Sequence, residues 1–352
     1  MKLFCYKAMC GDAFHLKYEG ESGKHRNILL DMGHPKTYKF VLKDVFLNLV
    51  EASEQVDALF LSHIHDDHIG GARRFIKDIQ LNDSLKSIVS RWVYNAPRRY
   101  TIKKTYDAKD GVLCGIVSGD KVYEHIQTHS PSDSYDVVEG QFLNIDGMKV
   151  TILSPNKDKL NKLREKYSNN RPLCKSETDE ISVKAGCVTD DYSTPLDQFK
   201  LDGFQEDANV ENASSIAAIF EFGGKRILWL SDSIPSVVVA SLSKLGYSET
   251  NKLYCDVVLL SHHGSSGNNS LDLFKLIAGE RYVISSDGIN RHCLPNKETI
   301  AKVVSASSVL PVSLFFNYCD GRLKRMFNSD DSEYLQSVVD VHCLKDMEAI
   351  EL

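Results

Sequence analysis

Ser62-His63-Ile64-His65-Asp66-Asp67-His68-Ile69-Gly70-Gly71 contains three imidazoles and two carboxylates within six positions. Divalent metals such as zinc bind imidazole nitrogens together with carboxylate oxygens. His63 and His65 lie two apart on an extended segment, so their side chains point the same way and can chelate one ion. Asp67 and His68 lie where the chain turns into a helix and can reach a second ion. A solvated loop rarely concentrates ligands at this spacing, so the stretch predicts a metal site.

The strand that leads into this stretch has a counterpart later in the chain. Asp57-Ala-Leu-Phe-Leu-Ser-His63 and Asp256-Val-Val-Leu-Leu-Ser-His262 share an aspartate, an apolar run, a serine and a histidine at identical spacing. Each reads as a buried strand with a histidine at its carboxyl end, where α/β sheets bind ligands. Two such strands can face one site from the two halves of a pseudo-symmetric sandwich.

The remaining pattern alternates short apolar runs, turns and helical spacings, which is typical of a layered α/β fold. Residues 105–145 are less regular, and the polar residues 170–211 read as a long loop or insertion. We expect helices after Gly71 and over 157–167 and 297–306. Strands are expected over 27–31, 56–62, 87–94, 148–153, 216–222, 226–230, 255–260, 282–285 and 312–317.

Further ligand candidates follow strands. Asp232, in Leu-Ser-Asp, can bridge two ions, although an acid at a strand end is common. His262 and His263 form an adjacent pair that needs partners if buried. His292 precedes an expected helix, where a histidine is also a common cap or surface residue. Asp31 ends the first apolar strand and is suited to accept the second N–H of a metal-bound histidine, with a plain turn aspartate as the alternative.

The ordered motifs resemble those of metallo-β-lactamase-fold hydrolases. They are Ile-Leu-Leu-Asp-Met-Gly, His-x-His-x-Asp-His-Ile-Gly-Gly, Ser-Ser-Ile with Ser-Asp downstream, Ser-His-His-Gly-Ser and His-x-x-Pro. Within that superfamily the chain looks most like the branch that contains the metal-dependent domain of the competence DNA-uptake channel. This branch also includes choline-phosphate esterases and stand-alone members, some found beside bacterial anti-phage genes.

This resemblance implies a four-layer αβ/βα sandwich over residues 1–320, with residues 321–352 as a C-terminal extension. It also implies two divalent ions, Zn²⁺ or Mn²⁺. His63 and His65 would hold the first ion, and Asp67, His68 and either His262 or His263 the second, with Asp232 as the bridge. Strand alternation leaves the choice within the histidine pair open. No histidine occurs between residues 130 and 261, where many relatives supply a third ligand to the first ion, so that ion is expected to be more open.

Such a site activates water for hydrolysis. Asp67 would orient the attacking water, and His292 would protonate the leaving group. The sequence contains no Walker-type phosphate loop, dinucleotide fingerprint or nucleophile elbow, which makes triphosphatase, redox and acyl-serine chemistry poor interpretations.

The substrate class rests on a basic strip. Arg91, Arg98 and Arg99 alternate with aromatic residues, and five basic residues and no acid occur between Arg91 and Lys104. Such a strip can follow phosphates while rings stack on bases, although a solvated basic strand face looks the same. The resemblance to the competence branch favours the first interpretation and implies a nuclease or phosphodiesterase that acts on nucleic acid. A small-molecule esterase or lactonase, and a metal-stabilised subunit of a bacterial defence complex, are the alternatives.

Composition limits the other possibilities. The net charge is −6, but residues 176–211 carry ten acids against two lysines, so the rest of the chain sums to +2. That acidic stretch suits a lid or a partner-binding loop. The nine cysteines are scattered without a Cys-x-x-Cys pair and suggest reduced, mostly buried thiols. No apolar run reaches the roughly 18 residues of a membrane span, and the polar start is unlike a signal peptide, so we expect a cytoplasmic protein.

Overall fold

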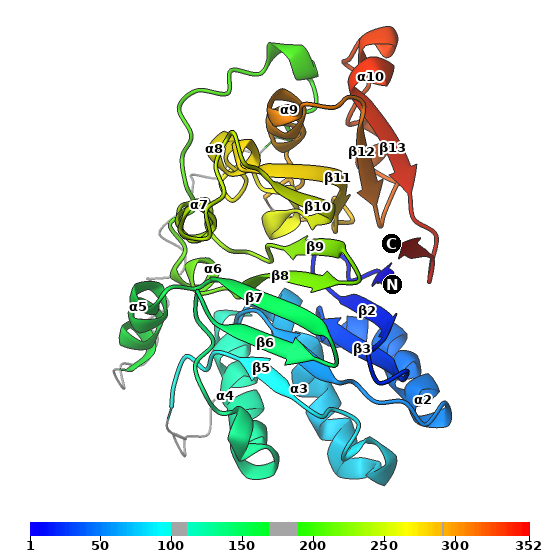
Figure 1. Ribbon diagram of the computed structural model, residues 1–352, viewed down its shortest axis with the longest axis vertical. Helices are drawn as coiled ribbons and strands as arrows, with labels where there is room; N and C mark the ends of the chain where they lie inside the picture. Colours follow the sequence, from blue (N-terminus) through cyan, green and yellow to red (C-terminus); the bar gives the residue numbers. More distant parts are fainter. Residues whose placement is uncertain (100–110, 169–188, 291) are drawn as a thin grey trace.

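The computed structural model describes residues 1–99, 111–168, 189–290 and 292–352, with only the backbone described for residues 111–114. Two mixed sheets lie face to face, and helices cover the outer face of each (Figure 1). One sheet has six strands and the other eight, and the helical layers make four layers in all. The expected α/β sandwich is confirmed.

The six-stranded sheet comes mostly from the first third of the chain. Its order is β14 (Ala349–Glu351), β1 (Lys2–Cys5), β2 (Phe14–Glu19), β3 (His25–Leu30), β4 (Ala58–Leu61) and β5 (Trp92–Tyr94). Its helices are α1 (Pro35–Thr37), a π-helical turn (Tyr38–Leu42), α2 (Lys43–Glu51), α3 (Asp66–Leu81) and α4 (Gly111–His129). The expectation of irregular structure is wrong for residues 111–129, which form α4. Residues 100–110 lie outside the described residues.

The eight-stranded sheet runs β13 (Val339–Cys343), β12 (Val312–Phe316), β11 (Ile277–Ile284), β10 (Leu253–Leu259), β9 (Lys225–Trp229), β8 (Ala217–Phe222), β7 (Met148–Ser154) and β6 (Phe142–Ile145). The remaining helices are α5 (Lys157–Ser168), α6 (Val210–Ala213), α7 (Pro235–Lys244), α8 (Leu271–Lys275), α9 (Lys297–Ala306) and α10 (Ser332–Val338). The buried side chains of α5 pack with residues of the six-stranded half. Short 3₁₀ turns lie at Asp83–Leu85, Pro131–Asp133, Leu196–Gln198, Ser261–Gly264 and Leu323–Arg325.

Three apolar clusters correspond to the three contacts between layers. The central cluster lies between the sheets and includes Phe60, Phe220 and Trp229, all fully buried. A second cluster joins the six-stranded sheet to its helices, and a third does the same for the eight-stranded sheet. Strands β4 and β10 are apolar along most of their length because both of their faces are covered.

The sequence similarity between the two halves corresponds to equivalent positions in the two sheets. Strand β4 pairs in parallel with β3 and β5, and β10 pairs in parallel with β9 and β11. Asp57 precedes β4 and accepts a hydrogen bond from the Asn27 amide of β3 at 2.8 Å. Asp256 of β10 accepts one from the Arg226 amide of β9 at the same distance. The two histidine-bearing strands are therefore anchored alike.

The C-terminal residues complete both sheets. Strand β13 pairs with β12, and β14 pairs with β1 in the other sheet. Cys319 and Cys343 form a disulfide that joins the ends of these neighbouring strands, so the expectation of reduced thiols is wrong for this pair. Sequence spacing gave no sign of it, because the two cysteines are 24 residues apart and meet only through the sheet.

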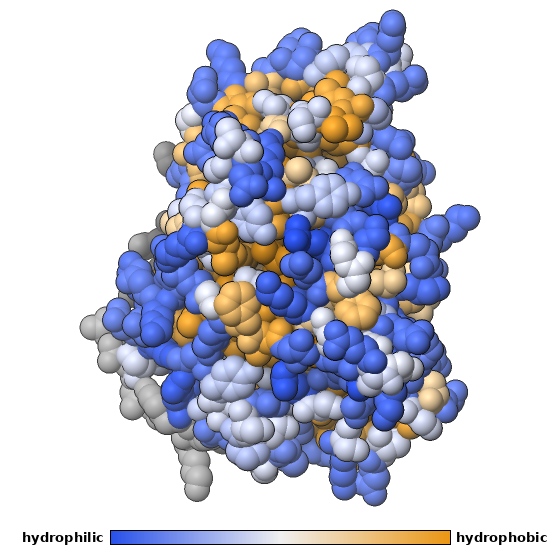
Figure 2. Space-filling view, viewed as in Figure 1, coloured by the Kyte–Doolittle hydropathy of each residue, from blue (hydrophilic) through white to orange (hydrophobic). Residues whose placement is uncertain are grey.

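The face of the molecule seen in Figure 2 is largely hydrophilic, with apolar side chains showing in its middle and near its top. In the described parts of the chain, no helix combines the length and the apolar character that crossing a membrane requires.

Candidate metal centre

The candidate ligands come together at the carboxyl ends of three strands, one in the six-stranded sheet and two in the eight-stranded sheet. His63 follows β4, Asp232 follows β9, and His262 and His263 follow β10. Helix α3 begins at Asp66, with His65 as its extended N-cap residue at φ −65° and ψ 142°. The helix therefore starts inside the motif, and its first turn places Asp67 and His68 beside His63.

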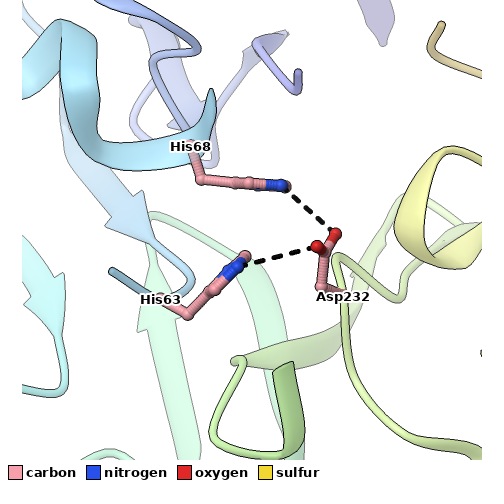
Figure 3. Close-up of side chains that lie close together, drawn as sticks. All are labelled: His63, His68 and Asp232. Atoms are coloured by element: carbon pink, nitrogen blue, oxygen red, sulfur yellow. Dashed lines mark ion pairs between the residues drawn. The ribbon is translucent and has the colours of Figure 1, made fainter. Parts of the chain in front are cut away.

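The most buried part of the cluster joins His63, His68 and Asp232 (Figure 3). One Asp232 oxygen, Oδ1, lies 3.2 Å from His68 Nε2, and the other, Oδ2, lies 3.6 Å from His63 Nε2. All three side chains are at most 1% exposed. The carboxylate thus stands between two imidazoles with one oxygen directed at each.

A second group shares His68. The Asp67 Oδ2 atom lies 3.9 Å from His68 Nε2 and 3.3 Å from His263 Nε2. His263 Nδ1 lies 3.3 Å from Asp12 Oδ1. Because His68 belongs to both groups, the cluster has two adjoining sets of ligands, as a pair of ions requires.

Both histidines of the 262–263 pair reach the cluster. His262 Nε2 lies 3.7 Å from Asp232 Oδ2, on the same carboxylate oxygen that faces His63. Strand alternation does not apply, because both residues lie past the end of β10 in left-handed backbone, with φ of 47° for His262 and 55° for His263. This tight turn directs two successive side chains to one site.

Hydrogen bonds fix which ring nitrogen faces the cluster. The Ser62 hydroxyl donates to Asp31 at 2.7 Å, so its oxygen accepts from His63 Nδ1 at 3.0 Å. His68 Nδ1 donates to Asp31 Oδ2 at 2.8 Å, and His262 Nδ1 to Asn268 Oδ1 at 2.7 Å. Each of these rings turns its Nε2 atom to the cluster, which is the usual arrangement around a bound metal.

The buried ligand atoms pass a simple test of fit. Six atoms of this cluster are buried without a hydrogen-bond partner among the described residues: His63 Nε2, His68 Nε2, His263 Nε2, Asp12 Oδ1 and both Asp232 oxygens. Buried polar atoms without partners are costly, and nitrogen and oxygen atoms of these types are what zinc and related ions bind. The residues present therefore fit a metal centre.

Burial and neighbouring charges shift the pKa values of His68 and His63 in opposite directions. Burial disfavours the charge on His68, but Asp232, Asp67 and Asp31 outweigh it and raise its pKa well above the usual value. Burial, reinforced by His68, holds the pKa of His63 well below its usual value.

The cationic form of His68 lowers the pKa values of the two neighbouring carboxylic acids, Asp232 and Asp67. Burial favours the neutral acid at Asp232, but His68 and the other neighbouring imidazoles outweigh it and hold its pKa well below the usual range. The same balance, with His68 and His263, lowers the pKa of Asp67. Both acids are therefore ionised at neutral pH and available as ligands.

His65 and His292 are placed less centrally. The His65 ring lies 4.6 Å from that of His63, measured between centroids, and neither ligand group among the described residues includes it. His292 is exposed in a turn after β11, and its backbone amide donates to Asn290 Oδ1 at 3.2 Å. Its role as a proton donor stays a prediction.

Two further buried polar atoms belong to residues 212–215. The Asn212 Oδ1 and Ser215 Oγ atoms are buried, and neither has a hydrogen-bond partner among the described residues. The side-chain nitrogen of Asn212 lies 3.5 Å from His262 Nδ1. The expectation of a more open first ion stays a prediction.

Asp12 is the site residue that sequence reasoning missed. It lies in the turn between β1 and β2, is 2% exposed, and contacts His263. Its amide also donates to the Asp67 carbonyl at 3.2 Å, which ties the turn to α3. In the sequence, only the short Gly11-Asp12 pair between two apolar runs marks this position. His263, which Asp12 contacts, is about 250 residues away in the sequence.

Two of the three arginines in the predicted nucleic-acid strip form ion pairs within the protein. Arg98 is 8% exposed and forms an ion pair with Asp120 at 3.5 Å, and Arg99 forms an ion pair with Asp136. Arg91 is partly exposed and has no ion pair among the described residues. The strip stays a prediction, and much of it lies in residues 100–104, outside the described residues.

Two sequence comparisons match the first part of the chain. The family model described as Metallo-beta-lactamase superfamily matches residues 21–139, which contain the 62–71 motif. Ribonuclease J of Mycoplasma genitalium (strain ATCC 33530 / DSM 19775 / NCTC 10195 / G37) is 34% identical over 95 residues. Those residues are 26% of this chain and 15% of that protein.

Solved structures with low sequence identity are also similar. CmlA, a diiron beta-hydroxylase from Streptomyces venezuelae, is 12% identical with a TM-score of 0.42, and the match covers 100% of this chain and 54% of that one. The Zn(2+)-bound PqqB from Methylobacterium extorquens is 13% identical with a TM-score of 0.37, covering 97% and 87%. The chain thus spans about half the length of CmlA. Residues 21–139 thus match the model of the Metallo-beta-lactamase superfamily, and the two facing sheets enclosed by helices are consistent with the fold of that superfamily.

Proposed function

We propose that the protein is a metal-dependent hydrolase that cleaves phosphodiester bonds of nucleic acid with water activated at a dinuclear centre. One observation carries the proposal. The buried Asp232 carboxylate stands between His63, His68 and His262, and a second acid, Asp67, stands between His68 and His263. Two adjoining ligand sets linked by a carboxylate are the usual design for two-metal hydrolysis.

The residues divide into ligands and supports. His63, with His65 beside it, and Asp232 would hold one ion, and Asp67, His68, His263 and Asp232 the other. His262 faces the shared carboxylate. Asp31 and Asn268 hold the rings in place. When bound, such ions supply Lewis acidity and lower the pKa of water to about 7.

Two residues would handle protons and substrate orientation. Asp67 is ionised at neutral pH and partly exposed, so it can accept a hydrogen bond from the attacking water but cannot serve as an acid. A proton for the leaving group must come from elsewhere, and His292 is the exposed histidine in the loop that follows β11.

Nucleic acid is the proposed substrate because of two observations. The matched relative is named Ribonuclease J, and the aligned segment is 34% identical. The motif set also resembles the branch that contains the hydrolase domain of the competence DNA-uptake channel. A site that would hold two divalent cations suits phosphodiesters, because the cations stabilise the negative charge of the transition state.

The test uses the full chain loaded with Zn²⁺ or Mn²⁺. Its substrates are single-stranded RNA, single- and double-stranded DNA, bis(p-nitrophenyl) phosphate, a p-nitrophenyl carboxylic ester and a lactone. We expect cleavage of at least one nucleic acid and of the small phosphodiester, and loss of both on chelation. Turnover of the ester or the lactone alone would overturn the nuclease assignment and favour the esterase alternative. Activity that survives complete removal of metal would overturn the metal-dependent mechanism.

A further inference from the structure

A cavity of about 370 Å³ belongs to no part of the chemistry described so far. Its lining includes Lys159 and Lys162 of α5 together with Glu206 and Asp207. The volume lies in the range of small-ligand sites, which run from roughly 300 to 1,000 Å³, and is enough for one nucleotide unit. Figure 1 shows α5 beside α6.

The cavity is joined to the centre through Asp207. This residue lines the cavity, and its Oδ2 atom lies 3.8 Å from Nδ1 of His262. Ile234, another lining residue, follows Asp232 by two positions at the start of α7. Asp207 contacts the side of the His262 ring that faces away from Asp232, so a ligand in the cavity would be separated from the candidate ion ligands by Asp207 and this ring.

The two acids of the cavity are already satisfied by neutral donors. Glu206 accepts hydrogen bonds from the amide and the hydroxyl of Ser236, at 2.7 and 2.8 Å. Asp207 accepts from the Asn209 amide at 2.8 Å and from the side-chain amides of Asn212 and Asn268. All four carboxylate oxygens have partners, and neither acid forms an ion pair with a lysine among the described residues.

The two lysines remain available to an anion. The Lys159 ammonium has no ion pair or hydrogen bond among the described residues. Lys162 pairs with Asp158 at 3.0 Å, but both side chains are more than half exposed, so the pair contributes little and exchanges readily. Residues three apart lie on one face of a helix, so both ammonium groups can reach the same phosphate.

The rest of the lining suits the other parts of a nucleotide. Val210, Ala213 and Ile234 provide apolar surface against which a sugar or a base can pack. We propose that the cavity is a nucleotide subsite in which Lys159 and Lys162 bind a backbone phosphate next to the scissile one. This inference rests on the proposed function, and it moves the main phosphate contact from the arginine strip to helix α5.

The experiment compares charge reversal inside and outside the cavity on one helix. Lys159→Glu and Lys162→Glu place an acid in the cavity, whereas Lys157→Glu, the matched control, changes an exposed lysine of α5 that does not line it. Each metal-loaded variant is assayed on a labelled single-stranded oligonucleotide and on bis(p-nitrophenyl) phosphate over a range of salt. Lys159→Ala tests the loss of charge without reversal, and thermal melting reports folding.

We expect KM for the oligonucleotide to rise about tenfold in each cavity variant, the cost of one charged hydrogen bond. The slope of log KM against log salt should fall by about 0.7 per lost phosphate contact. The small phosphodiester does not extend into the cavity, so its kinetics should stay unchanged, and Lys157→Glu should resemble wild type on both substrates.

Different results would overturn the nucleotide subsite and the proposed function. Equal oligonucleotide kinetics in Lys159→Glu and Lys157→Glu, in a protein that cuts nucleic acid, would overturn the subsite and leave the function standing. Equal losses on both substrates would also overturn it, because the lysines would then act at the centre itself. A wild-type protein that hydrolyses no phosphodiester with either metal would overturn the proposed function and the subsite together.

Discussion

The Asp232 carboxylate is the residue on which the two halves of the candidate centre converge. Its oxygens lie 3.2 to 3.7 Å from nitrogen atoms of His63, His68 and His262, and neither oxygen has a hydrogen-bond partner among the described residues. A buried acid without hydrogen bonds is tolerated because imidazole charge, and in the loaded protein metal charge, compensates it. The residue is therefore committed to binding cations.

Asp232→Asn should abolish activity while preserving the fold. The substitution keeps the volume of the side chain, so no cavity opens, but it removes the charge that holds two cations together. We expect activity to fall by several orders of magnitude and metal content to drop, with a near-native circular dichroism spectrum.

Asp256→Asn is the matched control for this substitution. Asp256 is equally buried, but it pairs with Lys225 away from the centre, so its variant should keep its metal. Full activity in Asp232→Asn would show that this carboxylate is not the bridge.

Metal binding should release protons. In the metal-free protein the neighbouring acids raise the pKa values of His68 and His263 above the usual value, so both rings are protonated at neutral pH. A metal needs the neutral ring, so binding displaces these protons, and the affinity falls as the pH falls.

Calorimetric titration of Zn²⁺ in two buffers of different ionisation enthalpy measures this release. We expect different apparent enthalpies at pH 7 and a tighter site at pH 8 than at pH 6. Identical enthalpies in the two buffers would contradict the assignment of these rings as protonated ligands.

Among individual residues, the sequence predicted most of the candidate ligands but not the complete set. Neighbours in sequence, such as His63, His65, Asp67 and His68, could be read together because the local chain fixes their positions. The histidine pair could not be decided, because its left-handed backbone depends on contacts made after folding. Asp12 could not be found for a similar reason, since its contact with His263 exists only in the folded chain.

Among the elements, the acidic segment has a role that its composition did not reveal. Its described part, residues 189–211, passes α9 and returns to α6 (Figure 1). Asp191 accepts hydrogen bonds from the first two amides of α9, at 2.8 and 2.9 Å, and Glu206 accepts from an amide in the first turn of α7. Acids at helix N-termini are stabilising because of the helix dipole. In its described part several acids cap or contact helices, and the role of the segment as a lid or a partner-binding loop stays a prediction.

Removing one such cap should cost stability and leave the chemistry intact. Asp191→Ala leaves two amides at the start of α9 unsatisfied, for which we expect a loss of about 1 kcal/mol. Asp197→Ala removes an exposed acid of the same segment and should change the stability by less than about 0.5 kcal/mol. Urea denaturation of both variants measures the difference, and equal stabilities would contradict the capping role.

For the whole molecule, the last strands matter more than a C-terminal extension would suggest. Ile350 of β14 pairs with Leu3 of β1 and is 4% exposed in the cluster between the sheets. The layered fold was predictable because its central strands have long apolar runs. The short strands β1, β13 and β14 were not, because three to five residues carry too weak a pattern.

Ile350→Ala should destabilise the protein by about 3 kcal/mol, the usual cost of removing a buried isoleucine side chain. Glu351→Ala is the control: its ion pair with Lys2 is exposed, so the loss should be below about 0.5 kcal/mol. Chemical denaturation followed by tryptophan fluorescence checks both values. Wild-type stability in Ile350→Ala would mean that β14 is not part of the folded core.

The origin of the ligands from both halves has a consequence for how the protein holds together. His63 and His68 belong to the half built on the six-stranded sheet, whereas Asp232, His262 and His263 belong to the half built on the other. Bound ions would therefore cross-link two layers that also meet in the apolar cluster between the sheets. By mass action, metal at a hundred times its dissociation constant adds about 2.7 kcal/mol to the free energy of unfolding. A cell that withholds metal would thus lower both the activity of this protein and its lifetime against proteolysis.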